Sequence, residues 1–161
     1  MRSGRYRFYL FYTLLLMIVL PILSILAELL LVKNTPAVWK LVGQWFLFWA
    51  VGVRLFTAGL NQIARPSFTL QSIFHINNLE SGIIVRELGI SNVGTGIGGI
   101  VSLLLVSWRV PIAFIAAVFL GAAALQHAIK KPVSENQWIA LFTDALIFLV
   151  LVGFLILSFV E

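Results

Sequence analysis

The sequence of 161 residues contains no cysteine and few charged side chains. The absence of cysteine excludes disulfide bonds, thiolate metal ligands and cysteine nucleophiles, so a metal site would depend on two histidines and six carboxylates. Charged residues make up 11% of the chain and hydrophobic residues 61%, whereas a soluble domain is roughly one quarter charged and about half apolar. This composition predicts an integral membrane protein with the lipid bilayer as its surroundings, and it leaves no room for a sizeable soluble domain.

The net charge of +5 raises the question of a nucleic-acid partner. However, most of the 11 Lys and Arg residues are spread among the connections between apolar runs, and they form no dense basic stripe that would follow a phosphate backbone. We therefore expect no nucleic-acid binding and interpret these residues as signals of membrane topology.

The apolar runs predict an all-α membrane bundle that forms a single domain over residues 1–161. A helix needs about 20 apolar residues to cross the hydrocarbon core. Five runs are close to that length, and the third is the least apolar, so four spans is the alternative count. A short helix at the cytoplasmic interface is predicted between spans two and three, after Pro66. The predicted spans are residues 9–32, 41–60, 83–107, 110–129 and 138–160.

Basic residues in alternate connections predict the orientation of the chain. Seven lie on the side of the N-terminus and three on the other, which by the positive-inside rule makes the N-terminus cytoplasmic and, with five spans, the C-terminus external. The seven are Arg2, Arg5, Arg7, Arg65, Arg86, Lys130 and Lys131, and the three are Lys33, Lys40 and Arg109.

Glycines in the third run have the spacing of a dinucleotide-binding turn, with Gly94, Gly96 and Gly99 in the order G-x-G-x-x-G. That fingerprint also needs a preceding strand and an acidic residue about 20 positions later. The run is apolar, and no carboxylate follows Gly99 before Glu135, so we reject a nucleotide site.

The same glycines fit helix packing in lipid, where small residues let backbones approach closely. We predict a packing surface between spans three and four, or between two copies of the chain, that uses Gly94, Gly98, Ser102, Ala117 and Gly121.

Several polar residues fall inside or at the ends of the predicted spans, where a charge costs about 2.5–3.5 kcal/mol on insertion scales. The topology puts them at one depth in the cytoplasmic leaflet, and we expect Arg54 to pair with Asp144 or Glu87. This cluster is either an internal network that fixes helix register, a pocket for a lipid headgroup, quinone or anionic substrate, or a proton path through Glu87, His127 and Asp144. Its members are Arg54, Asn61, Gln62, Arg65, Glu87, Asn92, His127 and Asp144.

No motif assigns a catalytic residue, a metal or a cofactor. His75 and His127 are both predicted on the cytoplasmic side, which permits a two-histidine site without arguing for one. The serines lie outside any nucleophile-elbow context. We therefore do not predict an enzyme.

Two segments resemble a family of small bacterial multi-pass membrane proteins without an assigned function. They are "FWAVGVRLFTAGLNQIARPSFTLQSIF" and "RELGISNVGTGIGGIVSL", and the similarity continues through "LQH" at 125–127 and "TDALIF" at 143–148. Within the first segment, "RLFTAGLNQIARP" is similar to the helix that opens DoxX-like four-helix membrane proteins, although this chain has an additional N-terminal span. The resemblance implies a compact helical bundle in a bacterial inner membrane, and it marks Pro66 together with the eight polar residues above as family-like positions.

Taken together, the sequence predicts a multi-pass inner-membrane protein that acts as a binding or accessory module, with a second copy or another membrane protein as partner. The alternative is a carrier of a lipid, quinone or anionic substrate, or a proton-coupled transporter, that uses the polar cluster.

Overall fold

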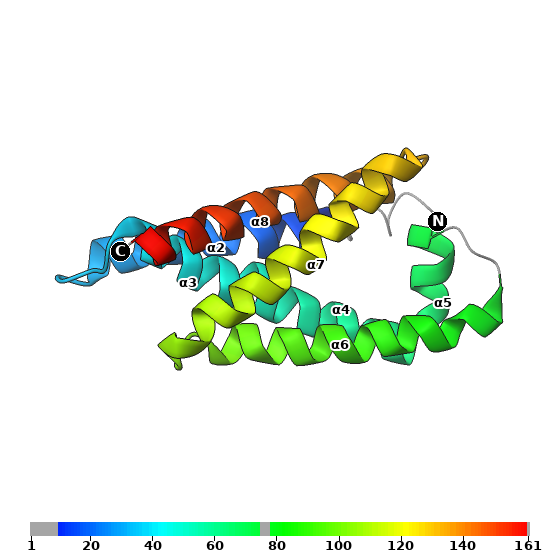
Figure 1. Cartoon of the computed structure of the whole chain (residues 1–161), viewed down its shortest axis with the longest axis horizontal. Helices are drawn as coiled ribbons and strands as arrows, with labels where there is room; N and C mark the ends of the chain where they lie inside the picture. The colour runs from blue at the N-terminus through cyan, green and yellow to red at the C-terminus, as the bar shows by residue number, and fades with distance from the viewer. Residues whose placement is uncertain (1–9, 75–77, 161) are drawn as a thin grey trace.

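In the computed structural model, which describes residues 10–74 and 78–160, every regular element is a helix (Figure 1). Four of these helices are long and apolar enough to cross a membrane: Leu10–Leu31, Val38–Ala64, Val106–Lys130 and Glu135–Val160. The predicted all-α class is confirmed, and the four helices support a multi-pass membrane protein.

The predicted third span, residues 83–107, has a different form. Helix α6 (Gly82–Val101) covers most of it, but its glycines and polar side chains dilute the apolar ones and α6 is not among the four candidate spans. The helix also ends before Ser107, and the short η5 (Val106–Trp108) already belongs to the next span. The predicted count of five spans is therefore not confirmed, whereas four helices meet the requirement of length and composition.

Spans one and two each contain a π-helical segment. Span one continues from η1 (Leu15–Val19) into α2 (Leu20–Leu31), and the wide turns of η1 come directly before Pro21, which has no N–H to donate to the preceding turn. Span two joins α3 (Val38–Phe46), η2 (Leu47–Val53) and α4 (Arg54–Ala64) without a break. It ends at Arg65, whose φ of −139° and ψ of 64° leave the helical region just before Pro66.

Short helical turns follow span two, in the region of the predicted interfacial helix. They are α5 (Pro66–Thr69) and η3 (Leu70–Phe74), and Thr69 and Leu70 are buried. α5 stands across one end of α6 (Figure 1). The short η4 (Leu79–Ser81) leads directly into α6. A helix is present as expected, but its location at a membrane interface is not confirmed.

The helices form two closely packed pairs on either side of a common core. α4 packs along α6, and α7 (Arg109–Lys130) packs along α8 (Glu135–Val160). α6 and α7 are joined by a short turn yet separate beyond it (Figure 1). The core between the pairs takes apolar side chains from spans one and two, α7 and α8, including Met17, Leu47, Val51, Leu120 and Leu151.

Glycines bring the backbones of span two and α6 into direct contact. A methyl group on Gly96 would lie 2.4 Å from the backbone nitrogen of Phe56, and one on Gly59 would lie 2.5 Å from the carbonyl oxygen of Gly89. Further along the same interface, a methyl group on Gly99 would meet Gly52 at 2.7 Å. These distances are too short for any Cβ, so this interface depends on glycine on both helices.

We predict that Gly96→Ala destabilises the protein, because the new methyl group forces α6 away from α4. The expected loss is about 1–3 kcal/mol, the usual cost of overpacking a closely packed interior. Gly94→Ala is the matched control, since a methyl group at Gly94 would meet nothing within 4 Å. Unfolding of the purified variants in detergent measures the difference, and equal stability of the two variants would contradict this interface.

Candidate functional site

A buried ion pair joins span two to α8. Arg54 Nη2 donates to Asp144 Oδ1 at 2.8 Å, and the two side chains are only 14% and 8% exposed. Asp144, one of the two partners expected for Arg54, is therefore the partner in the structure. Each charge offsets part of the free-energy cost of holding the other away from water. Either charge alone would be strongly destabilising at this buried position.

The position of this pair follows from the arrangement of the helices. Arg54 begins α4 and Asp144 lies in α8, and these two helices belong to different closely packed pairs. Along the helices, Arg54 lies about 15 Å from Ala64 and Asp144 about 14 Å from Glu135. Both distances are about half of the roughly 30 Å that a helix needs to cross a hydrocarbon core, so the pair lies near the middle of two candidate spans. The long Arg54 side chain thus links the two helix pairs near mid-span.

A second polar contact lies nearer the end of span two. Asn92 is buried in α6, and its Nδ2 donates to Oε1 of Gln62 at 2.8 Å. This amide pair connects the same two helices as the glycine interface. Both residues are members of the predicted cluster, but they bind each other rather than the ion pair.

The remaining members of the predicted cluster do not converge on Arg54 and Asp144. Asn61, Arg65 and Glu87 are exposed, and Glu87 is not the partner of Arg54. His127 is half-buried and lines a separate cavity. The structure therefore divides the predicted cluster into two internal pairs, three exposed side chains and a histidine. Within residues 10–74 and 78–160, no hydrogen bond links Glu87, His127 and Asp144 into a proton path.

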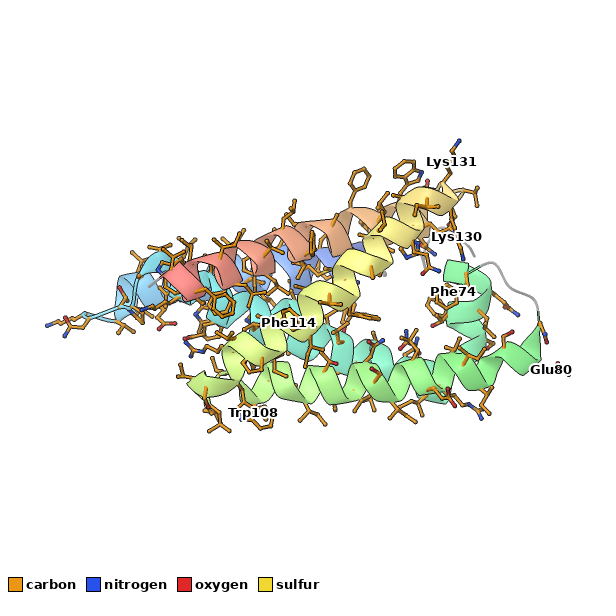
Figure 2. The ribbon with its side chains drawn as sticks, viewed as in Figure 1. Phe74, Glu80, Trp108, Phe114, Lys130 and Lys131 are labelled. Atoms are coloured by element: carbon orange, nitrogen blue, oxygen red, sulfur yellow. The ribbon has the colours of Figure 1, made fainter. Side chains whose placement is uncertain are left out.

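The cavity beside His127 lies at the turn between α7 and α8 and holds about 300 Å³. Polar side chains reach it from both helices, and Phe74 of η3 closes the facing side (Figure 2). The polar lining residues are Gln126, His127, Lys130, Lys131 and Gln137.

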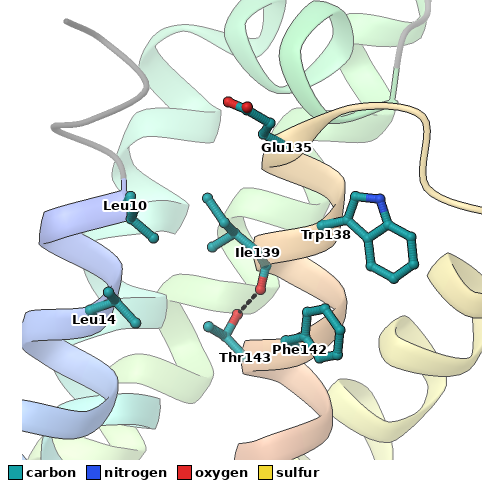
Figure 3. Close-up of a pocket in the computed structure, with 7 residues that line it drawn as sticks. All are labelled: Leu10, Leu14, Glu135, Trp138, Ile139, Phe142 and Thr143. Atoms are coloured by element: carbon teal, nitrogen blue, oxygen red, sulfur yellow. Dashed lines mark hydrogen bonds between the residues drawn. The ribbon is translucent and has the colours of Figure 1, made fainter. Parts of the chain in front are cut away.

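A second cavity of about 300 Å³ lies between the start of span one and the first turns of α8 (Figure 3). Its walls are mostly apolar and include Leu14, Trp138 and Phe142. The hydroxyl of Thr143 lies within this lining, but it donates to the carbonyl of Ile139 at 2.7 Å and so serves its own helix. Glu135 stands at one edge with its carboxylate directed away from the apolar walls (Figure 3).

The predicted packing residues have several different neighbours. Gly98 faces Ile112 at the start of α7, and Gly121 lies against Phe148 of α8. Ala117 belongs to the common core, and buried Ser102 donates to the carbonyl of Gly99 at 2.7 Å. Gly94 is exposed, with nothing within 4 Å of where its Cβ would be. The small residues of α6 and α7 therefore do not form one shared seam, because α6 packs on span two and α7 packs on α8.

The sequence interpretation missed the glycine interface of span two and several bonds of span one. Gly52 and Gly59 are seven positions apart, as are Gly89 and Gly96, and this matching repeat in two helices is a usable signal. In span one, Oε2 of Glu28 accepts hydrogen bonds from Trp45 at 2.7 Å and Gln44 at 3.0 Å.

Two further bonds connect span one with span two. The hydroxyl of Ser24 accepts a hydrogen bond from Trp49 Nε1 at 3.0 Å, and the hydroxyls of Tyr12 and Thr57 are bonded to each other. Together with the Glu28 contacts, these bonds fix span one against the stretch of span two from Gln44 to Thr57.

Among residues 10–74 and 78–160, no three histidine, aspartate or glutamate side chains lie close enough to hold a metal ion. His75 falls outside these described residues, so its position relative to His127 is not defined by the structure.

Comparison with known proteins gives one match. The model of a family of unknown function, DUF6790, matches residues 11–160, which is almost the whole chain. No curated protein and no solved structure matches the chain. The expected family without an assigned function is thus confirmed, whereas the similarity of residues 54–66 to DoxX-like proteins finds no support.

We predict that Asp144→Leu alone is strongly destabilising, because it leaves Arg54 charged and buried without its carboxylate. The expected loss is about 3–5 kcal/mol, and the double variant Arg54→Met/Asp144→Leu should regain most of it, as apolar replacements of buried ion pairs often do. Unfolding in detergent measures both variants, with Arg65→Met as the control for loss of an exposed arginine. A double variant no more stable than Asp144→Leu would show that the ion pair is not what couples these residues.

Proposed function

Since this chain belongs to the DUF6790 family, which has no assigned function, we propose a function from its geometry: a multi-pass membrane accessory module that presents the outer face of α6 to a helix of a partner protein. A second copy of the chain is the simplest form of such a partner. We place the module in a bacterial inner membrane.

The outer face of α6 carries this proposal. Exposed isoleucines along it are Ile83, Ile90 and Ile97, and between them lie Glu87, Ser91 and Gly94, which are also exposed. In lipid, helices associate through small residues and polar contacts rather than through apolar surface alone. A face that mixes isoleucine with glycine, serine and a carboxylate is better suited to another helix than to acyl chains.

The inner face of α6 supports the same conclusion, because it is already occupied. Gly89, Gly96 and Gly99 lie directly against span two. Gly94 points elsewhere and has open space around it. A partner backbone can therefore approach at Gly94 without displacing any contact of the bundle.

In the proposed topology α6 also crosses the membrane, which together with the four candidate spans gives five crossings. It contains 20 residues, which corresponds to about 30 Å of helix, the thickness of a hydrocarbon core. It also runs along α4 and returns the chain to the end at which α7 starts (Figure 1). With the N-terminus in the cytoplasm, α5 and η3 then lie at the cytoplasmic interface and the C-terminus lies outside.

Five crossings predict that alkaline phosphatase fused after Glu161 is active in bacterial cells, because the fusion is exported. A green fluorescent protein fused at the same position should not fluoresce. The control is the same pair of fusions after Lys131, which we expect to behave in the opposite way. Fluorescence of the fusion at Glu161 would instead support four crossings.

We predict that Gly94→Leu weakens the association with a partner by about fivefold or more, since a large side chain at the contact point costs about 1–3 kcal/mol. Crosslinking in membranes and mass measurement of gently solubilised protein would record both a second copy and any other protein in fixed ratio. Val118→Leu, on the exposed side of α7, is the control for a larger side chain facing lipid. A protein that is monomeric in membranes, with no partner in fixed ratio, would overturn this function.

The carrier alternative is favoured by one observation, the buried ion pair between two different helix pairs. In a carrier, an anionic or protonated substrate would compete for Arg54 or Asp144 and so open the pairs. The double variant Arg54→Met/Asp144→Leu distinguishes the two functions, because an assembly module should keep its partner and a carrier should lose its bound small molecule.

A further inference from the structure

The cavity at the turn between α7 and α8 has an uneven distribution of charge. His127, Lys130 and Lys131 all come from the last turn of α7 and the residue after it, and no carboxylate lines the cavity among the residues that the structure describes. Lys130 extends toward Phe74, whereas Lys131 stands at the outer edge of the turn (Figure 2). The cavity of about 300 Å³ therefore offers positive charge and hydrogen-bond donors without a built-in counter-ion.

The backbone at Lys131 supplies a second observation. Its φ is +55°, and it is the one residue other than glycine with a positive φ in the described part of the chain. Glycine is the usual residue at such a helix end, because a side chain is strained there. A lysine in this position is thus held in the turn at a conformational cost that glycine would not carry.

The surroundings of the cavity are apolar in the direction of the bilayer. Leu125 and Ile129 are exposed on α7, six and two residues before Lys131, and Val133 is exposed in the turn. The cavity lies where one candidate span ends, at Lys130, and the next begins, at Glu135. Positive side chains next to lipid-facing apolar ones, at the end of two spans, match the place of a phospholipid headgroup and its chains.

We propose that this cavity binds the phosphate group of an anionic membrane lipid, with Lys130 and Lys131 as the charged contacts and the acyl chains along Ile129 and Leu125. Free phosphate shares the chemistry of the headgroup, but the apolar flank adds binding only for a lipid. This inference does not depend on the proposed contact of α6 with a partner, which lies on another helix.

The test uses the purified full chain in mixed micelles and measures the thermal midpoint and retained lipid by native mass spectrometry. The probes are phosphatidylglycerol, phosphatidylcholine, and inorganic phosphate alone. We expect one retained phosphatidylglycerol and a raised midpoint, neither of which occurs with phosphatidylcholine or inorganic phosphate. Each of Lys130→Gln and Lys131→Gln should weaken retention of phosphatidylglycerol about fivefold, the usual contribution of one basic residue near an anionic surface.

Lys131→Gly separates binding from structure, because glycine relieves the strained φ while it removes the charge. We expect this variant to be at least as stable as the native chain without lipid, yet to retain less phosphatidylglycerol. Lys33→Gln, which removes an exposed lysine from the turn between α2 and α3, is the control for overall charge. Equal retention of phosphatidylglycerol by the Lys33 and Lys131 variants would overturn the site, and an equal effect of inorganic phosphate would overturn the assignment to a lipid.

Discussion

The hydrocarbon core offers no hydrogen-bond partner, so every polar group within it must be satisfied by another part of the protein. Span two meets this constraint for the buried polar side chains of three neighbouring helices. From one end to the other it is bonded to span one through Glu28, to α8 through Asp144 and to α6 through Asn92. Each of these bonds fixes one neighbour at one angular position, and together they make span two the central helix of the fold.

Two different devices hold the neighbours of span two. Toward α6 the backbones touch at paired glycines, which allows no change in distance between the helices. Toward α8 a long arginine side chain crosses the space between separate helix pairs and carries the contact by charge. The first device holds α4 and α6 in backbone contact, whereas the second connects that pair of helices to α8 by one charged contact.

The sequence predicted the elements of the fold better than their faces. Uncompensated charges in apolar runs indicate a partner, and Arg54 and Asp144 could be matched in this way because few charges were available. Depth along a helix follows from counting residues, but rotation about its axis does not when nearly every side chain is apolar. For this reason the structure does not show two features that the sequence predicted, the packing of Gly94 against another helix and the grouping of His127 with the ion pair. The seven-residue spacing of Gly52 and Gly59, which does mark a contact, was not recognised. Whether α6 crosses the membrane was also hard to predict, because the glycines that let it pack against span two lower its mean hydropathy.

The π-helical segment η2 directly before Arg54 ties these contacts to chain length. A π-helix contains one more residue in a turn than an α-helix, and each residue of an α-helix turns the chain by about 100°. Deletion of a single residue between Leu47 and Val53 would therefore be absorbed if the wide turns of η2 became α-helical, which keeps α4 at its angle relative to α3. A deletion within α4, where the turns are already α-helical, would instead rotate Gly59 and Gln62 by about 100° relative to Arg54, and the ion pair and the contacts with α6 would no longer form together. Span two should consequently tolerate a change of length in η2 far more readily than in α4.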